Sequence, residues 1–154
     1  MTVILRRWSP DDGPLLAEGA RAAYIAKIEQ LERTDALRVR VADRWAWVVA
    51  LDGDPVGAIG AAARHVPRMA ELGYWVVPRA RGCGVAKAAV AQAVGLLFAD
   101  GVERIQATVE PWNEASRRTL EGAGFTREGL LRGYIAYPGE PRGDVYLYAL
   151  LSES

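Results

Sequence analysis

The clearest chemical signal in this sequence is a basic loop that contains two glycines. The loop spans residues 81–87 and reads Arg-Gly-Cys-Gly-Val-Ala-Lys. It follows an aromatic and β-branched run, residues 73–77, which is typical of a strand and is ended by Pro78. After the loop, apolar residues recur every three or four positions as far as Phe98, which predicts one long helix. Free N–H groups at a helix N-terminus favour an anion, and glycine lets the backbone approach phosphate oxygens. Residues 82–87 therefore predict a site for a pyrophosphate-bearing molecule.

Three known phosphate-binding patterns share this strand–loop–helix arrangement. The P-loop is absent, because Lys87 is followed by alanine instead of serine or threonine. The dinucleotide pattern G-x-G-x-x-G begins well but has Lys87 in place of its third glycine, and about half of the chain precedes it. The pattern [R/Q]-x-x-G-x-[G/A] is satisfied by residues 81–86 and, in an overlapping frame, by residues 79–84.

With this third pattern, the sequence resembles the GNAT superfamily of N-acetyltransferases, which bind acetyl-coenzyme A through it. The branch that it resembles is that of the ribosomal-protein N-terminal acetyltransferases. There, a Gly-Tyr-Trp strand, a proline, the loop, an N-x-x-S helix start and a Gly-Phe pair follow in order. The matching residues are Gly73-Tyr74-Trp75, Pro78, Arg81 to Ala86, Asn113 to Ser116, and Gly124-Phe125. The spacing from proline to loop favours the frame that begins at Arg81. The resemblance is specific from about residue 71 to residue 125 and loose before residue 45.

The resemblance implies a fold. We expect a single acetyltransferase domain over residues 1–154, of the α+β class, with a mixed, mostly antiparallel sheet of about seven strands and flanking helices. The sheet is expected to be splayed between its fourth and fifth strands. Sequence patterns place strands at 3–8, 45–51, 56–63, 71–77, 105–110, 125–137 and 145–151, and helices at 84–100 and 113–123. They also predict a helix start at 9–12, an interrupted helical stretch at 15–31, a solvated connection at 32–44 and a hairpin turn at 52–55.

The resemblance also implies a donor site. Acetyl-coenzyme A is the expected acetyl donor, and its pantetheine arm enters the gap between the splayed strands in this family. Unpaired backbone groups beside the gap need partners, which pantetheine amides supply, and a backbone N–H there can polarise the thioester oxygen. The expected contacts are Trp75, Val76, Val77 and Asn113, together with Arg81, Gly82, Cys83, Gly84, Val85, Ala86 and Lys87 from the loop.

Acetyl transfer to an amine also needs proton transfers. A protonated amine must lose a proton before it attacks, and the candidate bases are Glu71 and Glu110, although each also suits a solvated strand end or a turn. Direct transfer needs mainly positioning, so that a dedicated base is not required. Many family members place a tyrosine on the second helix as the acid that protonates the departing thiolate, where this chain has Leu120. Ser116 matches the branch in which a serine is the candidate for that role, but Asn113 and Ser116 also suit a helix cap and a first turn.

Composition bounds the remaining classes. Among 154 residues, 19 basic and 19 acidic side chains cancel, so that no overall field attracts nucleic acid or an anionic membrane. No apolar run is long enough to span a membrane, and no His/Cys cluster suggests a metal. Cys83 has no motif link to the single histidine, His65, which disfavours a thiol nucleophile. One cysteine fits a cytoplasmic protein, and we expect a monomer or homodimer.

These observations predict an acetyl-CoA-dependent N-acetyltransferase. It would move the acetyl group to a primary amine, either a protein N-terminus or a small molecule, by direct transfer in a ternary complex. Two alternatives remain open at this point. The missing tyrosine at Leu120 leaves room for a non-catalytic acyl-CoA-binding module. The partial G-x-G-x-x-G match leaves room for a dinucleotide-binding protein.

Overall fold

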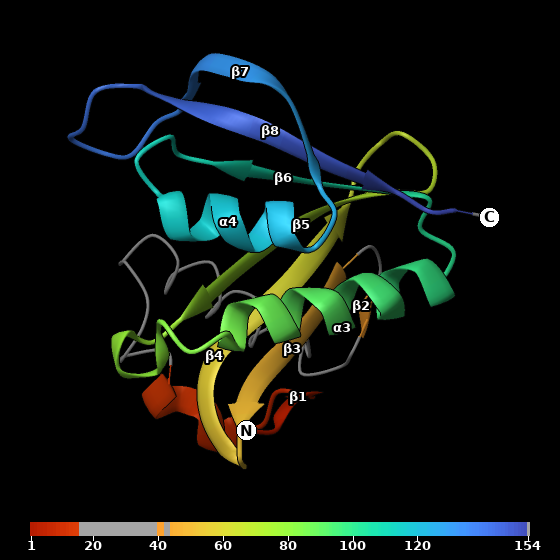
Figure 1. Ribbon diagram of the computed structural model, residues 1–154, viewed down its shortest axis with the longest axis vertical. Helices are drawn as coiled ribbons and strands as arrows, with labels where there is room; N and C mark the ends of the chain where they lie inside the picture. Colours follow the sequence, from red (N-terminus) through yellow and green to blue (C-terminus); the bar gives the residue numbers. More distant parts are fainter. Residues whose placement is uncertain (16–39, 42–43, 154) are drawn as a thin grey trace.

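The structure is a computed structural model that describes residues 1–15, 40–41 and 44–153 of the chain. Figure 1 shows one curved sheet with helices lying across it. The strands of the described part are β1 (Val3–Arg6), β2 (Arg40–Val41), β3 (Arg44–Leu51), β4 (Asp54–Ala63), β5 (Met69–Val76), β6 (Arg104–Val109), β7 (Thr126–Ile135) and β8 (Gly143–Leu151). The helices are α3 (Val85–Ala99) and α4 (Glu114–Gly122), and short 3₁₀ turns lie at Pro10–Asp12 and Pro78–Ala80.

The strands form an eight-stranded sheet in the order β1-β3-β4-β5-β6-β8-β7, with β2 paired to β3 beside this path. Every pairing is antiparallel except that of β5 with β6. The predicted α+β class and mostly antiparallel sheet are therefore confirmed. The short β2 was not predicted, because it lies in the stretch expected to be a solvated connection. Two residues are too few to show the alternation by which a strand is recognised.

Most local predictions agree with the structure. Ser9 caps the predicted helix start in a capping box with Asp12, which is buried and bonded to Arg6. The hydrogen bond from the Arg6 guanidinium lowers the pKa of the Asp12 carboxyl group. The predicted hairpin turn contains Asp52 and Gly53, both with positive φ angles, of 50° and 85°. Of the interrupted helical stretch predicted for residues 15–31, only Leu15, which is buried, falls within the described residues.

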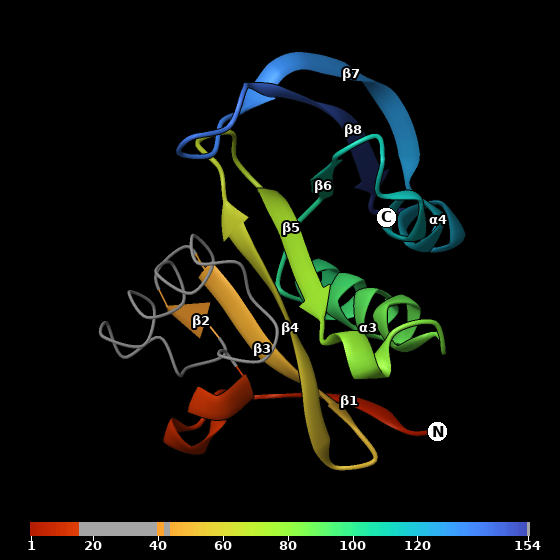
Figure 2. The same ribbon diagram turned by 90° about the vertical axis from the view of Figure 1, so that its left-hand side faces the viewer.

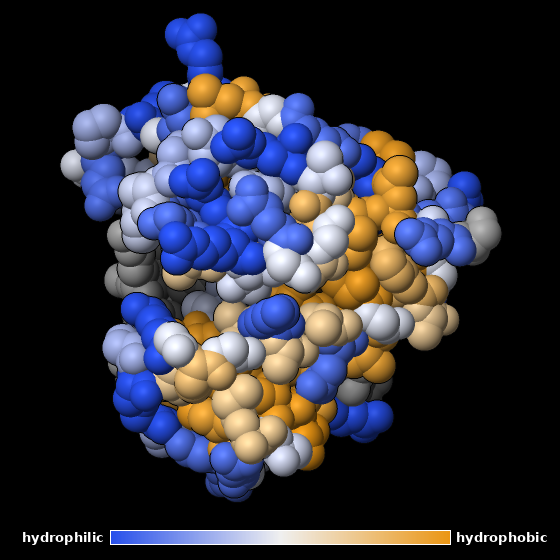
Figure 3. All heavy atoms as spheres, in the orientation of Figure 1, coloured by the Kyte–Doolittle hydropathy of each residue, from blue (hydrophilic) through white to orange (hydrophobic). Residues whose placement is uncertain are grey.

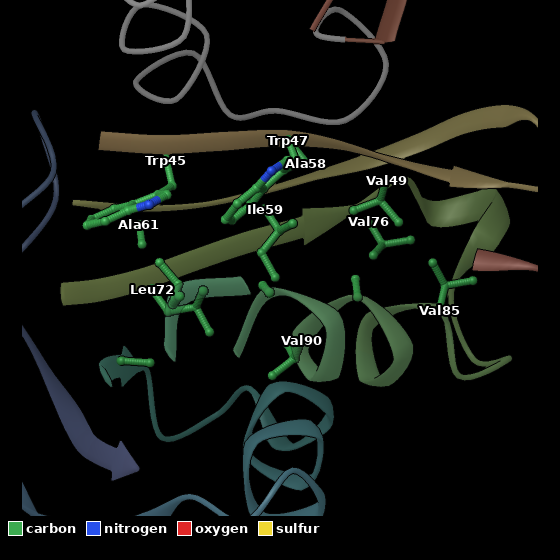
Figure 4. Close-up of a cluster of buried hydrophobic side chains, with 14 of the residues drawn as sticks. Trp45, Trp47, Val49, Ala58, Ile59, Ala61, Leu72, Val76, Val85 and Val90 are labelled. Carbon is green, nitrogen blue, oxygen red and sulfur yellow. The ribbon is translucent and has the colours of Figure 1, made fainter. Parts of the chain in front are cut away.

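The core lies between the sheet and α3 (Figure 4). Trp45 and Trp47 of β3 are 6% and 3% exposed and share one strand face, as their alternation predicts. Close packing of the strands depends on Gly57, where a Cβ atom would overlap the backbone carbonyl oxygen of Trp75. This contact holds β4 tightly against the end of β5, from which the glycine-containing loop emerges.

The sheet opens between β5 and β6. Their parallel register covers only Met69–Glu71 against Arg104–Gln106. Beyond that point β5 stays paired with β4 as far as Val76, whereas β6 stays paired with β8 as far as Val109. Figure 1 shows the two strands diverging, and Figure 2 shows α3 and α4 on the same side of the sheet. The predicted splay between the two strands on either side of the loop helix is confirmed.

Candidate functional site

The loop at the N-terminus of α3 has a backbone that requires glycine at two positions. Gly82 and Gly84 have φ angles of 80° and 83°, in the left-handed region that residues with a Cβ rarely adopt. Gly84 is the N-cap of α3, and the first turn of this helix contains no acidic residue. The space around both Cα atoms is open: a Cβ on Gly82 would meet nothing within 4 Å, and one on Gly84 only the Met1 side chain at 3.9 Å. The loop thus presents its backbone to an open surface.

The N–H groups of this loop are available to a ligand. The first backbone bond of α3 runs from Ala88 N–H to the Gly84 carbonyl oxygen, and Arg81 N–H donates to Pro78. Between them, within the described part of the chain, the N–H groups of residues 82–87 have no recorded acceptor. Consecutive free donors at a helix N-terminus favour a negatively charged group such as a pyrophosphate. The residues present therefore fit the predicted anion.

The two arginines of the overlapping motif frames have different surroundings. Arg79 is bound to Asp54 and to the Pro55 carbonyl oxygen on the β3–β4 hairpin. The Nε of Arg81 donates to the Val76 carbonyl oxygen at 2.7 Å, which ties the loop back to the end of β5. Of the two motif frames, the one that begins at Arg81 is therefore the one whose arginine holds the loop against β5.

The side chains of the loop differ in exposure. Arg81, Cys83 and Lys87 are exposed, Ala86 is half-buried, and Val85, the first residue of α3, is buried. The Lys87 side chain lies beside the end of α4, with its Cε atom 3.9 Å from where a Cβ on Gly122 would be. Cys83 Sγ donates to the Ala80 carbonyl oxygen at 3.3 Å, which is a loop-stabilising contact. Figure 3 shows hydrophobic residues gathered over α3 and hydrophilic residues over α4 above it.

At the end of β5, the three expected pantetheine contacts differ in the direction in which their backbone N–H groups point. Val77 N–H donates to the Val56 carbonyl oxygen at 2.8 Å, so this group is already used. Along a strand, successive residues direct their N–H groups to opposite sides. The N–H of Trp75 therefore points toward β4, like that of Val77, whereas the N–H of Val76 points toward the side of β6. On that side the pairing with β6 has ended. Of the three, Val76 thus has an N–H that faces the gap.

Asn113 and Ser116 lie on the other side of the gap, at the start of α4. Asn113 is the predicted cap, since its Oδ1 accepts from Ser116 N–H at 3.2 Å. The Ser116 hydroxyl group lies 2.7 Å from the hydroxyl group of Tyr74 on β5. Burial raises the pKa of Tyr74, an effect that the hydrogen bond with Ser116 partly offsets. The structure therefore brings Ser116 to the edge of β5, which sequence reasoning did not predict.

Of the two candidate bases, Glu71 lies on the face of β5 opposite to Tyr74. Glu71 pairs with Gln106 of β6, whereas Glu110 directly follows Val109, the last residue of that strand. Glu71 forms an ion pair with Arg64 at 3.1 Å. Among the described residues, the Glu110 carboxylate has no hydrogen-bond or ion-pair partner, whereas its carbonyl oxygen accepts from Asn113 N–H. Of the two, Glu110 is thus the carboxylate whose oxygens have no partner among the described residues.

Sequence reasoning missed two residues of this site. Tyr74 was part of the Gly-Tyr-Trp motif but was given no role, because its partner Ser116 is distant along the chain. Gly57 carried no motif at all, although it lets β4 approach Trp75. In the described part of the chain, no cluster of His, Cys, Asp or Glu side chains is arranged to hold a metal. No described helix has the length and apolar character needed to cross a membrane.

Comparison with known proteins identifies the family. The family model described as acetyltransferase (GNAT) domain matches residues 2–126. This chain belongs to the GNAT acetyltransferase family. An uncharacterized N-acetyltransferase of Bacillus subtilis (strain 168), YoaA, is 38% identical over 100 residues, covering 62% of this chain and 55% of that protein. The chain thus spans about half the length of this relative.

Solved structures of GNAT enzymes share the fold. Mycobacterium smegmatis RimJ in complex with CoA-disulfide is 26% identical, with a TM-score of 0.79 over 98% of this chain and 82% of that chain. A chimera of Vibrio cholerae spermidine N-acetyltransferase SpeG with hSSAT is 20% identical, with a TM-score of 0.81 over 98% and 96% of the two chains. The second likeness supports the fold alone.

Proposed function

We propose that this GNAT protein transfers an acetyl group from acetyl-coenzyme A to a primary amine by direct transfer in a ternary complex. The observation that carries the proposal is the combination of two openings at the end of β5. One is the row of N–H groups without an acceptor at residues 82–87, and the other is the splay that begins after Glu71 and Gln106. A pyrophosphate fits the first and an extended pantetheine arm fits the second. The CoA-disulfide in the RimJ relative supports this assignment.

Each candidate residue then has a proposed role. Arg81, Lys87 and the N–H groups of Gly82 to Lys87 hold the phosphates, while Trp75, Val76 and Asn113 line the pantetheine arm, and Val77, which is buried and bonded to Val56, supports the strand end. The donor supplies an activated acetyl thioester. The Val76 N–H polarises the thioester oxygen, because a fixed donor stabilises charge that develops during attack. Ser116 donates a hydrogen bond to the departing thiolate and assists its protonation.

The proposed base is Glu110, acting directly or through water, with Glu71 as the second candidate. A base must hold a free lone pair near the amine, and the Arg64 ion pair of Glu71 occupies part of its carboxylate. Glu71 lies on the face of β5 opposite to Tyr74 and its partner Ser116, so that with Glu71 as the base the amine and the thiolate would exchange protons on different faces of the sheet. We also propose one acetyltransferase domain over residues 1–154, a cytoplasmic location and a monomeric or homodimeric state. The location rests on the single cysteine.

One observation favours a second candidate function, a non-catalytic acyl-CoA-binding module. Leu120, at the position of the family's tyrosine, is fully buried and contributes to the core, so that α4 offers no phenol there. A dinucleotide-binding protein is disfavoured, because its sheet is mostly parallel and here a single described pair of strands is parallel.

Two measurements test these assignments. Coenzyme A should raise the melting temperature of the protein and NAD should not, whereas a shift with NAD alone would favour the dinucleotide reading. Thiol release from acetyl-CoA should then be measured against a panel of amines: N-terminal peptides, polyamines, amino sugars and other small amines. Release that depends on one of these amines identifies the acceptor class. Binding of coenzyme A without release for any amine would favour the non-catalytic module.

A further inference from the structure

Tyr74 and Ser116 bring two hydroxyl groups together across the opening of the sheet. Tyr74 lies on β5 beyond the last pair with β6, on the same face as Leu72 and Val76 of the core. Its hydroxyl oxygen is 2.7 Å from Ser116 Oγ and 3.3 Å from the Ser116 carbonyl oxygen. The contact joins residues that are 42 positions apart, one on a strand and one on a helix. This hydrogen bond connects β5 to α4 at the place where β5 and β6 have separated.

Ser116 is therefore held at two atoms. Its backbone N–H is fixed by the Asn113 side chain and its hydroxyl oxygen by Tyr74. A serine hydroxyl hydrogen normally rotates to suit its surroundings, so that its direction is decided by the acceptors and donors near it. A tyrosine that donates to Ser116 Oγ occupies one lone pair and leaves the serine hydrogen free to point elsewhere.

We propose that Tyr74 is a positioning residue that turns the hydroxyl hydrogen of Ser116 toward the departing thiolate. This inference rests on the proposed acetyl transfer and on the role proposed for Ser116. In this arrangement Tyr74 of β5 supplies a phenol, whereas α4 has Leu120 in place of the family's tyrosine. The phenol does not contact the sulfur of the thiolate but acts on it through Ser116. Tyr74 keeps its own proton throughout.

The 2.7 Å contact between the two hydroxyl oxygens is the same in either direction, and the acidity of the phenol favours donation from Tyr74. In the opposite arrangement Ser116 would donate to Tyr74, and Tyr74 would donate to the Ser116 carbonyl oxygen at 3.3 Å. Hydrogen bonds between oxygens lie at about 2.5–3.0 Å, so the carbonyl contact, which only the opposite arrangement uses, is a long one. A phenol is also the better donor of the two hydroxyls, because it is the more acidic.

The surroundings of Tyr74 suit a donor that does not titrate. Burial raises the pKa of the phenol above its ordinary value, which keeps the proton on Tyr74 near neutral pH. Transfer of that proton to Ser116 would leave a phenolate in a partly buried position, where charge is disfavoured. Tyr74 thus serves as a fixed hydrogen-bond donor, and the chain of two hydroxyls strengthens the bond that Ser116 offers to the sulfur.

The test is a double-mutant cycle on Tyr74→Phe and Ser116→Ala, measured with acetyl-CoA and the amine that gives the fastest thiol release. Ser116→Ala should lower kcat at least about tenfold with little change in KM for acetyl-CoA, because the contact strengthens in the transition state. Tyr74→Phe should lower kcat about three- to tenfold, the range expected for one neutral hydrogen bond. In the Ser116→Ala background, Tyr74→Phe should change kcat less than about twofold, because the hydroxyl that it orients is gone.

Matched variants separate positioning from stability. Tyr148→Phe removes another buried phenol oxygen, one bonded to Glu121 at 3.3 Å, and should leave kcat unchanged. Ser116→Thr keeps the hydroxyl and should retain most of the activity. It also tests the serine if Tyr74→Phe does not fold.

Several outcomes would overturn the inference while leaving acetyl transfer intact. Normal kcat in Tyr74→Phe would do so, as would equal losses in both backgrounds, which would indicate a structural role. An alkaline limb of the pH–kcat profile that disappears in Tyr74→Phe would show that the phenol titrates, which contradicts a fixed donor. If Ser116→Thr lowers kcat as much as Ser116→Ala does, the orientation of a hydroxyl group cannot be the cause of the loss in kcat. If the unmodified protein releases no thiol with any amine, the proposed function itself fails.

Discussion

The two ends of helix α3 use the same residue type for opposite purposes. At the N-terminal end, Gly82 and Gly84 have left-handed backbones, and the donors around them have no recorded acceptor among the described residues. At the C-terminal end, Gly101 is also left-handed, with a φ angle of 96°. There the last carbonyl groups of the helix accept from the N–H groups of Asp100, Gly101 and Val102, and Trp45 Nε1 donates to the Asp100 carboxylate at 2.7 Å.

The difference shows what marks a ligand site on a helix. Every α-helix leaves unpaired donors at one end and unpaired acceptors at the other, and both must find partners. The C-terminal end of α3 finds them within the fold, so that its glycine serves only to reverse the chain. The N-terminal end leaves them to solvent or to a ligand. A left-handed glycine is therefore not by itself a sign of binding, whereas a row of unused N–H groups beside it is.

The largest expected effect comes from placing the same substitution at the two ends. Gly84→Val should weaken coenzyme A binding at least about a hundredfold, since the side chain blocks close approach and charge-assisted bonds to backbone N–H groups contribute about 1.5–3 kcal/mol each. Gly101→Val should leave the affinity unchanged. Both positions are open and left-handed, so each substitution should cost a similar stability, about 1–2 kcal/mol. Calorimetry and urea unfolding on both proteins measure the two quantities.

Either of two results would contradict this difference between the two ends of α3. A folded Gly84→Val protein that binds coenzyme A normally would remove the loop as the phosphate site. A loss of affinity in Gly101→Val as large as that in Gly84→Val would mean that general strain on α3, and not contact with the ligand, governs binding.

The second prediction concerns the C-terminal end of α3 alone. Trp45→Phe removes the indole N–H that donates to Asp100 and keeps most of the buried ring. Hydrogen bonds to charged groups contribute about 1.5–3 kcal/mol, so the free energy of unfolding should fall by about that amount. Coenzyme A affinity should not change when measured well below the melting temperature. A weakened affinity in the folded variant would show that the two ends of the helix are coupled.

The sequence predicted what is local and missed what is not. The strand–loop–helix segment, the Asn113 cap and the turn at residues 52–55 agree with the structure because each depends on a few neighbouring residues. The family resemblance supplied the splay, which no local pattern indicates. The partners of Arg81, Glu71 and Ser116 were not predictable from spacing, because each is set by where another segment ends. Val77 was expected to offer its N–H, and only the register with β4 shows that this group is already used.

Arg81 is the third test, because it links the open end of α3 to β5. Its Nε holds the Val76 carbonyl oxygen, so Arg81→Ala should both remove a positive charge and loosen the end of the strand. We expect coenzyme A affinity to fall about tenfold. This loss is smaller than that expected for Gly84→Val and larger than that expected for removal of an exposed surface charge. Arg81→Lys keeps the charge but not the planar donor, and should recover only part of the loss. Full recovery by lysine would assign Arg81 to charge alone.

The smallest expected effect is at Lys87, which is exposed in the first turn of α3 and has no recorded ion-pair partner among the described residues. A surface charge near an anion contributes about 0.3–1 kcal/mol, so Lys87→Ala should weaken coenzyme A binding about two- to fivefold. Because exposed charges are screened by salt, the variant should also lose part of the salt dependence of binding, and the two proteins should converge at high ionic strength.

The control for Lys87 is Arg118→Ala, which removes a charge that is also exposed but is already bound to Glu114 on α4. Titrations of both variants at several salt concentrations separate a local contact from the overall charge. If Lys87 contacts a phosphate, only Lys87→Ala should flatten the salt dependence. Equal slopes for the two variants would assign Lys87 to the solvated surface, and the phosphates would then be held by the backbone N–H groups and Arg81. The open end of α3 would in that case recognise its ligand mainly through the peptide backbone.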